Sequence, residues 1–284
     1  IVVDEFHHAA APTYQKLLEY YQPKILLGLT ATPERMDGKN ILPYFSNRIA
    51  AEIRLPEAID RKLLCPFQYF GVTDTVDLDA LKWSAGGYQK SELEHVYTFS
   101  GAVADRRADH VVTALLKYVT DIDEVKGLGF CVTVDHAEFM CRYFNDHNIP
   151  SMCLTGQSSD EERAAAKRRL VSGDVRFIFV VDIYNEGVDI PEVNTVLFLR
   201  PTESLTIFLQ QLGRGLRLSE DKECLTVLDF IDEPVELGFD CPLDLHCTYT
   251  RDQLLVALDF MKPSTVREGV KWLPEKNIEV FFVT

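Results

Sequence analysis

The sequence lacks several features that would place it in common classes of protein. No apolar run is long enough to cross a bilayer and no signal peptide opens the chain, which predicts a cytoplasmic protein without a membrane partner. The 7 cysteines form an odd total without disulfide-framework spacing, which predicts reduced thiols. Cys241, His246 and Cys247 lack a fourth partner at zinc spacing, which disfavours a zinc site.

Positive charge is scarce as well. Lys and Arg total 29 against 44 Asp and Glu, which gives a net charge of −15. This balance is the reverse of a general nucleic-acid binder, although a local cleft that contacts the nucleic-acid backbone is compatible with it. The 284 residues are 46% hydrophobic, which is enough for one large domain or two modest ones.

Two carboxylates follow the first apolar run. Ile1–Val3 predicts a buried parallel strand, with Asp4 and Glu5 at its carboxyl end, where open α/β sheets bind ligands. Such a pair suits Mg²⁺ held through water, with the second acid orienting an attacking water. The alternative is a solvated turn in which one of the two acids caps the next helix.

Two hydroxyls follow the second apolar run. Ile25–Leu29 predicts a strand that ends in Thr30-Ala31-Thr32-Pro33, where Pro33 stops the regular structure. This turn either passes hydrogen bonds between neighbouring sites or is an ordinary threonine turn.

The octet Gln210–Arg217 carries a third pattern. Gln210, Arg214 and Arg217 follow each other at offsets of four and three, which predicts that they share one face of a helix. Two guanidiniums on one face can grip a phosphate or stabilise charge on a transferred phosphoryl group. The alternative is a surface helix with paired charges. Gly213 and Gly215 argue against it, since each weakens a helix by about 1 kcal/mol.

A fourth pattern lies between Phe177 and Leu199. Phe177–Asp182 predicts a strand, which leads through Asn185 and Glu186 to Gly187-Val188-Asp189-Ile190-Pro191 and then to a second strand at Thr195–Leu199. With Asp4-Glu5-Phe6-His7, Thr30-Ala31-Thr32 and the octet, in this order, the chain resembles superfamily 2 helicases of the DExH type over most of residues 1–233. It is similar to helicase subunits of restriction enzymes, and more so to bacterial helicase-like proteins with a phospholipase-D-type nuclease domain.

The resemblance implies a fold, two cofactors and a set of residue roles. The fold is α/β, with RecA-like parallel sheets and flanking helices, and the cofactors are ATP and Mg²⁺. Asp4 would hold Mg²⁺ through water, Glu5 would position the attacking water, and Arg214 and Arg217 would be arginine fingers. Nucleotide contacts are further implied for His7, Gly187, Asp189 and Gln210, and coupling to the nucleic acid for Thr30 and Thr32.

Two positions depart from the pattern of the family. Val181 stands where relatives often have Thr, and Gln211 where many have Arg. Thr155 and Gly156 follow a further predicted strand and could contact a nucleic-acid phosphate, or form a plain turn.

The sequence also lacks the Gly-x4-Gly-Lys-Ser/Thr run that cradles phosphates in such motors. We therefore expect these residues to belong to a longer protein and to be inactive alone as an ATP hydrolase. The expected activity of the full-length protein is ATP-driven movement on nucleic acid, with DNA favoured as the partner. The alternatives are a duplex translocase that does not separate strands, and a non-catalytic interaction module. A nuclease domain in the same parent chain is implied by resemblance alone.

The expected organisation has four parts. Residues 1–55 would be the end of a first RecA-like domain, and residues 56–108 a connector or accessory insertion with a short strand at Phe67–Phe70. Residues 109–233 would form the second RecA-like domain, with helices over Asp109–Val119, Asp135–Phe144 and Asp160–Leu170. Residues 234–284 would open a C-terminal accessory domain.

Overall fold

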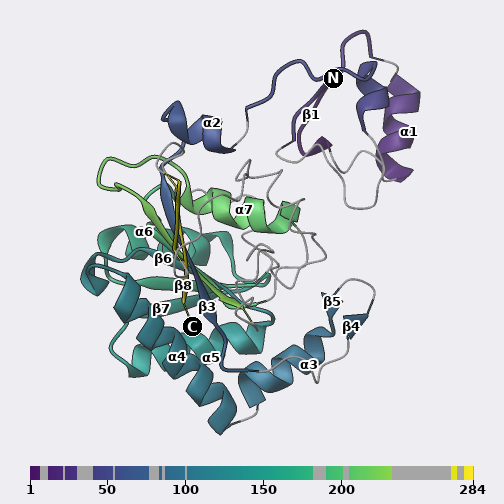
Figure 1. The fold of residues 1–284 in the computed structure, drawn as a ribbon. Helices are drawn as coiled ribbons and strands as arrows, with labels where there is room; N and C mark the ends of the chain where they lie inside the picture. Colours follow the sequence, from purple (N-terminus) through teal and green to yellow (C-terminus); the bar gives the residue numbers. More distant parts are fainter. Residues whose placement is uncertain are drawn as a thin grey trace. The chain divides into compact units, whose positions relative to one another are not determined.

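The computed structural model describes residues 1–6, 12–21, 23–30, 41–53, 55–76, 83–84, 87–99, 101–181, 190–200, 205–231, 270–273 and 278–283. The chain divides into two compact units, Ile1–Arg54 and Leu55–Thr284, and each is described by itself. Figure 1 labels their helices and strands. No helix in the described ranges is both long and apolar enough to cross a membrane.

Unit 1 is a small α/β unit. It contains β1 (Val2–Val3), α1 (Pro12–Tyr21), β2 (Leu27–Gly28) and the 3₁₀ helix η2 (Leu42–Phe45). The two strands pair in parallel, with Val2 opposite Leu27 and Val3 opposite Gly28. Val3, Phe6 and Ile41 form its buried core, with Tyr14 and Phe45 packed against them. The strand predicted at Ile25–Leu29 is present but is only two residues long.

Unit 2 is built on one sheet of eight described strands, in the order β11-β12-β3-β10-β9-β6-β8-β7. All neighbouring strands run parallel except β11 and β12. Their bounds are β3 (Phe67–Thr73), β6 (Gly127–Phe130), β7 (Ser151–Leu154), β8 (Phe177–Val180), β9 (Thr195–Phe198), β10 (Leu225–Ile231), β11 (Val270–Leu273) and β12 (Ile278–Val283). The parallel α/β class predicted from the sequence is therefore confirmed.

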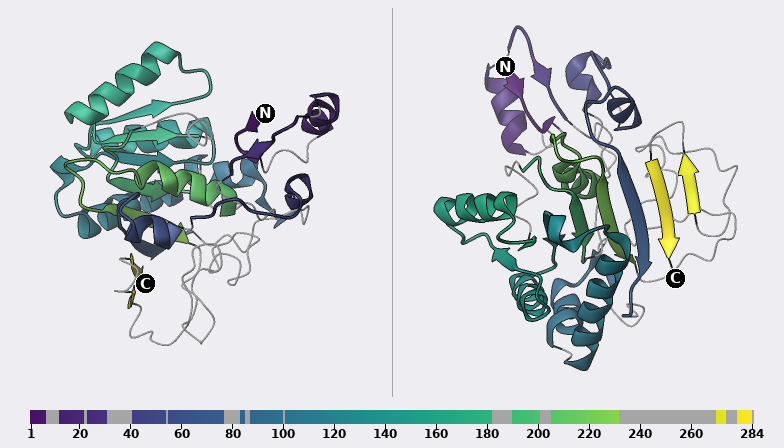
Figure 2. Two further views of the ribbon diagram at one scale, coloured as in Figure 1. Left: turned by 90° about the horizontal axis from the view of Figure 1, so that it is seen from above. Right: turned by 90° about the vertical axis from the view of Figure 1, so that its left-hand side faces the viewer.

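Helices cover both faces of this sheet. The longer ones are α4 (Ala102–Tyr118), α5 (Val134–Asp146), α6 (Asp160–Ser172) and α7 (Leu205–Gly215). Buried side chains of α4 and α5 pack with Phe177 and Phe179 on one face of β8, whereas α6 and α7 pack with Ile178 and Val180 on the other. This explains why β8 is an unbroken apolar run, because a parallel strand with helices on both faces of its sheet is buried on both sides. Figure 2 shows the layers from two further directions.

Short elements complete unit 2. They are α2 (Leu55–Asp60), the hairpin strands β4 (Trp83–Ser84) and β5 (Gly87–Tyr88), α3 (Lys90–Glu94), the π-helix η3 (His95–Phe99) and the 3₁₀ helix η4 (Ile122–Glu124).

The strand predicted at Phe67–Phe70 is present and longer, but it is not part of a separate insertion. β3 lies between β10 and β12 in the main sheet. Its residues alternate between the two cores, with Tyr69 on the face of α7 and Phe70 on the face of α4, so the strand requires a helix layer on each side. β12 and β11 likewise extend this sheet rather than opening a second one.

Two helix starts differ from the prediction. α4 begins at Ala102, seven residues before the expected start at Asp109. The N-cap of α5 is Thr133 instead of Asp135, because the Thr133 hydroxyl accepts a hydrogen bond of 3.3 Å from the His136 amide. The predicted helix over Thr250–Leu258 lies outside the described residues.

Candidate functional site

Asp4, Glu5 and Thr30 follow the two paired strands of unit 1 at the same edge of its sheet. The Leu29 amide donates to the Val3 carbonyl over 2.9 Å, and the Phe6 amide donates to the Leu29 carbonyl over 2.8 Å. Because β1 and β2 are parallel, Asp4 and Glu5 leave the sheet beside Thr30. The pairing thus joins two sequence patterns that are 25 residues apart, counted from Glu5 to Thr30.

The backbone at the two acids is a tight turn. Asp4 is exposed, and its Oδ1 accepts a hydrogen bond of 2.9 Å from the Glu5 amide. Glu5 has a φ of 49°, a left-handed conformation that costs a non-glycine residue on the order of 1 kcal/mol. The completely buried Phe6 ring holds the turn, packing edge-on against Phe45 with ring centroids 4.7 Å apart.

These acids fit the implied metal. Asp4 presents an exposed carboxylate whose orientation is fixed by a backbone amide, and carboxylate oxygens are the ligands of hard cations such as Mg²⁺. Among the described residues, no group of three or more His, Cys, Asp or Glu side chains is placed to enclose a metal.

The octet of unit 2 is divided between a helix and the loop after it. Gln210 and Arg214 lie one turn apart on α7 and are both half-buried. α7 ends at Gly215, so Arg217 lies beyond the helix and the prediction that all three share one helical face is wrong. Arg217 is half-buried in the segment that leads towards β10.

The end of α7 has a physical cause. A Cβ on Gly215 would lie 2.5 Å from Cδ1 of the buried Leu225, so this glycine permits close packing of the helix on β10. The next residue, Leu216, is buried, and its carbonyl accepts a hydrogen bond of 2.8 Å from the Cys65 amide. Gly213 differs, because in the described part of the chain no atom outside its own helix backbone lies within 4 Å of the place of its missing Cβ.

The two family departures can also be located. Gln211 is completely buried on the core side of α7, so this position cannot present a side chain to an external phosphate. Val181 directly follows β8 and is half-buried against the core under α5.

Thr155 and Gly156 follow β7 in a hydrogen-bonded turn. The Thr155 hydroxyl accepts from the Gln157 amide over 3.3 Å, and the Thr155 amide donates to the Ser158 hydroxyl over 3.0 Å. Ser159 then caps α6 in a capping box with Glu162. These bonds account for Thr155 as a turn residue, and a nucleic-acid contact there stays a prediction. His7, Thr32, Gly187 and Asp189 lie outside the described residues.

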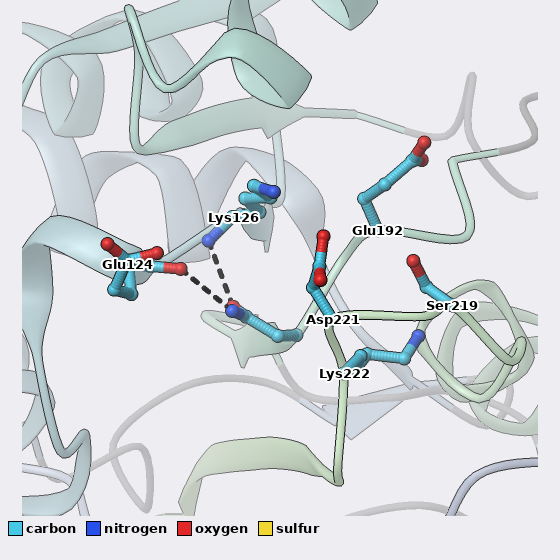
Figure 3. Close-up of a pocket in the computed structure, with 7 residues that line it drawn as sticks. Glu124, Lys126, Glu192, Ser219, Asp221 and Lys222 are labelled. Atoms are coloured by element: carbon cyan, nitrogen blue, oxygen red, sulfur yellow. Dashed lines mark hydrogen bonds between the residues drawn. The ribbon is translucent and has the colours of Figure 1, made fainter.

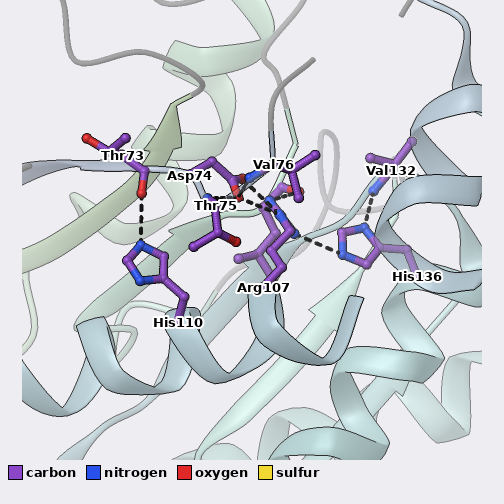
Figure 4. Close-up of polar contacts among 9 residues, drawn as sticks. Thr73, Asp74, Thr75, Val76, Arg107, His110, Val132 and His136 are labelled. Carbon is purple, nitrogen blue, oxygen red and sulfur yellow. Dashed lines mark hydrogen bonds and ion pairs between the residues drawn. The ribbon is translucent and has the colours of Figure 1, made fainter. Parts of the chain in front are cut away.

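Unit 2 contains a buried polar cluster that no motif of the sequence predicts. Arg107 of α4 is 1% exposed, and its Nε lies 2.8 Å from Oδ2 of Asp74 (Figure 4). Its Nη2 donates to the Leu199 carbonyl over 3.1 Å, and its guanidinium lies 3.8 Å above the Tyr97 ring. Burial and the nearby Arg107 charge lower the pKa of His136 well below its usual range, so the imidazole is neutral. The cluster ties α4 and η3 to the carboxyl ends of β3 and β9.

The described cysteines are free thiols. They are Cys65, Cys131, Cys141, Cys153 and Cys224. Burial raises the pKa of Cys153 to about 12 and that of Cys131 further, so these thiols are poor nucleophiles. Cys241, His246 and Cys247 lie outside the described residues.

Two family models match the chain. Residues 110–219 match the helicase conserved C-terminal domain, and residues 1–35 match the res subunit of type III restriction enzymes. These two matches make the chain similar to helicases and to restriction-enzyme subunits. The first match begins within α4 and includes the whole octet, and the second includes Asp4, Glu5 and Thr30.

Similar proteins agree with this assignment. The IRC3 protein of Saccharomyces cerevisiae, named as an ATP-dependent helicase, is 28% identical over 238 residues, which cover 81% of this chain and 34% of the relative. The DNA 3'-5' translocase XPB2 of Sulfurisphaera tokodaii is 25% identical over 255 residues, which cover 80% of this chain and 57% of the relative. The chain thus spans only a part of the curated relatives it matches.

Solved structures share the fold. A fragment of an HsdR subunit of a type I restriction enzyme from Vibrio vulnificus has a TM-score of 0.61 at 24% identity, over 85% of this chain and 46% of that one. The ATP-dependent Type ISP restriction-modification enzyme LlaBIII, bound to DNA, has a TM-score of 0.60 at 14% identity, over 100% of this chain and 21% of that one.

Proposed function

We propose that the full-length protein containing this chain is an ATP-dependent translocase or helicase that moves on nucleic acid, with DNA as the favoured track. The observation that carries the proposal is the pairing of β1 with β2, which brings Asp4, Glu5 and Thr30 to one sheet edge. Acids and a hydroxyl at the carboxyl edge of parallel strands are what nucleotide hydrolysis and its coupling require.

Four residues of this chain would have separate roles in ATP hydrolysis. Mg²⁺, when bound, neutralises phosphate charge, and Asp4 would hold it through water. Glu5 would orient the attacking water and receive its proton. Arg214 and Arg217 would stabilise the negative charge that develops on the transferred phosphoryl group, where a planar guanidinium offers paired donors.

ATP turnover by the full-length protein tests the proposal. Steady-state hydrolysis is measured without nucleic acid and with single-stranded DNA, duplex DNA and RNA, and we expect stimulation to be greatest with DNA. These 284 residues alone, which lack the phosphate-cradling run, should hydrolyse no ATP and serve as the control. If the full-length protein shows no turnover with any nucleic acid, the interaction-module alternative replaces this proposal.

A second pair of assays separates the two kinds of motor. Displacement of a labelled strand from a partial duplex reports unwinding, whereas displacement of a triplex-forming strand reports movement along an intact duplex. Triplex displacement without strand separation would favour the duplex translocase. Strand separation at the rate of ATP turnover would favour the helicase.

A further inference from the structure

Lys222 is a buried lysine whose ammonium is completely hydrogen-bonded. The residue is 9% exposed and lies in the turn between α7 and β10. Its Nζ donates to three backbone carbonyls: Pro191 over 2.6 Å, Val193 over 2.9 Å and Gly215 over 3.0 Å. An ammonium has three donors, so all of them are used.

Burial of this charge is unfavourable by itself. Desolvation lowers the pKa of Lys222 below its ordinary value. The carbonyls offset this cost, and the Gly215 carbonyl belongs to the C-terminal end of α7, where the helix dipole favours a cation. A buried lysine that is so fully bonded fixes the position of the backbone around it.

The three carbonyls come from two segments with predicted chemical roles. Pro191 and Val193 lie just after Asp189, in the loop that leads to β9. Gly215 lies between Arg214 and Arg217. Lys222 therefore ties the loop after Asp189 to the segment that carries both arginines.

Cys65 holds the same segment from another side. Its amide donates to the Leu216 carbonyl over 2.8 Å, and its thiol donates to the Gly215 carbonyl over 3.5 Å. Residues 215 and 216 are thus fixed by Lys222 and by the segment entering β3. This matters because Arg217 is outside the helix and owes its position to this junction.

Lys222 also lines a polar pocket of about 280 Å³, together with Glu124, Lys126, Glu192, Asn194, Ser219 and Asp221 (Figure 3). The Lys222 ammonium has no N–H left to donate to a ligand in this pocket, because all three are bonded to carbonyls. The geometry favours a positioning role over a binding role.

We propose that Lys222 is a positioning residue for Arg214 and Arg217, holding the end of α7 against the loop after Asp189 so that both guanidiniums are set for catalysis. This inference rests on the proposed ATP hydrolase activity.

The test is Lys222→Met in the full-length protein, with Lys126→Met as the matched control. The methionine keeps much of the length and apolar body of the lysine but cannot donate. Lys126 lines the same pocket but makes none of the three bonds to carbonyls. We expect kcat to fall by about 10- to 100-fold for Lys222→Met, with KM for ATP within about twofold, because displaced arginines affect the transition state most. Lys126→Met should match wild type.

A combined variant separates positioning from general stability. If Lys222 acts through the two arginines, adding Lys222→Met to a variant that carries both Arg214→Ala and Arg217→Ala should lower kcat by less than about twofold. An equal fractional loss in both backgrounds, or a Lys222→Met kcat equal to wild type, would overturn the inference while leaving the ATPase proposal intact. Absence of wild-type turnover would instead overturn the proposed function, and this inference with it.

Lys222→Arg covers the case in which Lys222→Met does not fold. A planar guanidinium cannot direct its donors to the three carbonyls as an ammonium does. Its kcat should therefore fall while KM for ATP stays close to wild type at a temperature where the variant is folded, and an unchanged kcat would contradict the role.

Discussion

Tyr69 donates a hydrogen bond of 2.6 Å to Oδ2 of Asp229, joining two neighbouring strands inside the sheet of unit 2. Asp229 is 3% exposed, and burial raises its pKa to about 7 despite the bond from Tyr69, which lowers it. The folded protein therefore keeps this carboxyl protonated over a pH range in which the unfolded chain ionises it.

The first prediction concerns pH and Asp229→Asn. The folded pKa of about 7 is above the ordinary value of 3.8. The wild-type protein is therefore destabilised by this carboxyl as pH rises from 3.8 to 7, whereas below pH 3.8 the group is protonated in both the folded and the unfolded state. Asparagine stays neutral and keeps an acceptor for Tyr69. The free energy of unfolding of Asp229→Asn, relative to wild type, should therefore rise by up to about 1.4 kcal/mol per pH unit over this range and then level off.

Urea unfolding at pH 4.5 and pH 8 measures this difference. Asp221→Asn, which changes an exposed carboxylate just before the same strand, is the matched control and should follow wild type at both values. A pH-independent difference for Asp229→Asn would show that the carboxyl is ionised in the fold.

The second prediction compares two consecutive arginines of α4. Arg107→Lys should lower the free energy of unfolding by about 3 kcal/mol, because one ammonium cannot hold Asp74, bond Leu199 and cover the Tyr97 ring together. Arg106→Lys should change it by less than about 0.5 kcal/mol, since Arg106 is exposed and its Nε donates to the Ala102 carbonyl of its own helix. Equal effects in thermal or urea unfolding would remove the special role of the buried cluster.

The two arginines also show what local sequence can and cannot predict. Arg106 and Arg107 are the same residue type on one helix. Helical spacing puts Arg107 on the buried face with Ala104 and Val111, but its partners come from segments distant in the sequence. For a related reason, the sequence pattern puts Phe67–Phe70 in an insertion and not in the main sheet. Its partner strand β10 begins 158 residues later, counting from Phe67 to Leu225. The β1–β2 edge was predictable, since each strand is a short apolar run followed directly by its polar residues.

The end of α7 was less predictable. The spacing of Gln210, Arg214 and Arg217 fits one helical face, but Gly215, Leu216 and the Lys222 ammonium end the helix first. A lysine in a polar turn usually faces solvent, so no local signal marks Lys222 as buried.

The third prediction compares the two glycines of the octet. Gly215→Ala should destabilise the protein by about 1–3 kcal/mol, because the new methyl group would lie 2.5 Å from Cδ1 of Leu225 in a packed core. Gly213→Ala should stabilise it by up to about 1 kcal/mol, because its site is open and alanine favours a helix. Melting temperatures of both variants test the pair. A stabilising Gly215→Ala would contradict close packing at Gly215, and a destabilising Gly213→Ala would contradict an open site at Gly213.

The fourth prediction concerns Glu5 in the full-length protein. Glu5→Gln keeps the size of the side chain but loses the basic oxygen, so ATP turnover should fall by about 10²- to 10⁴-fold while nucleotide binding is nearly unchanged. Asp4→Asn should weaken Mg²⁺-dependent binding instead, because Asp4 is the exposed carboxylate at this turn. Turnover rates and titration with a fluorescent ATP analogue separate the two effects. Equal loss of binding and turnover for Glu5→Gln would reassign Glu5.

The last prediction concerns Arg217, which lies outside α7 and two residues after its final glycine. As an arginine finger it would act on charge that develops in the transition state, so Arg217→Ala should reduce DNA-stimulated turnover by about 10³-fold or more with a smaller change in ATP affinity. Arg217→Lys should rescue poorly, because a point ammonium cannot copy the planar fork. Gln210→Ala, one helical turn before Arg214, tests whether the rest of this surface shares the role.

A purely structural Arg217 predicts a different result. A half-buried arginine in a surface ion pair contributes at most about 1 kcal/mol to stability, so Arg217→Ala would lower the melting temperature slightly and leave turnover unchanged. The decisive measurement is the steady-state ATPase rate of the folded full-length variant with and without single-stranded DNA. A stimulated rate equal to wild type would remove Arg217 from the active site, and a loss rescued fully by lysine would mean that charge alone, without bidentate geometry, is required.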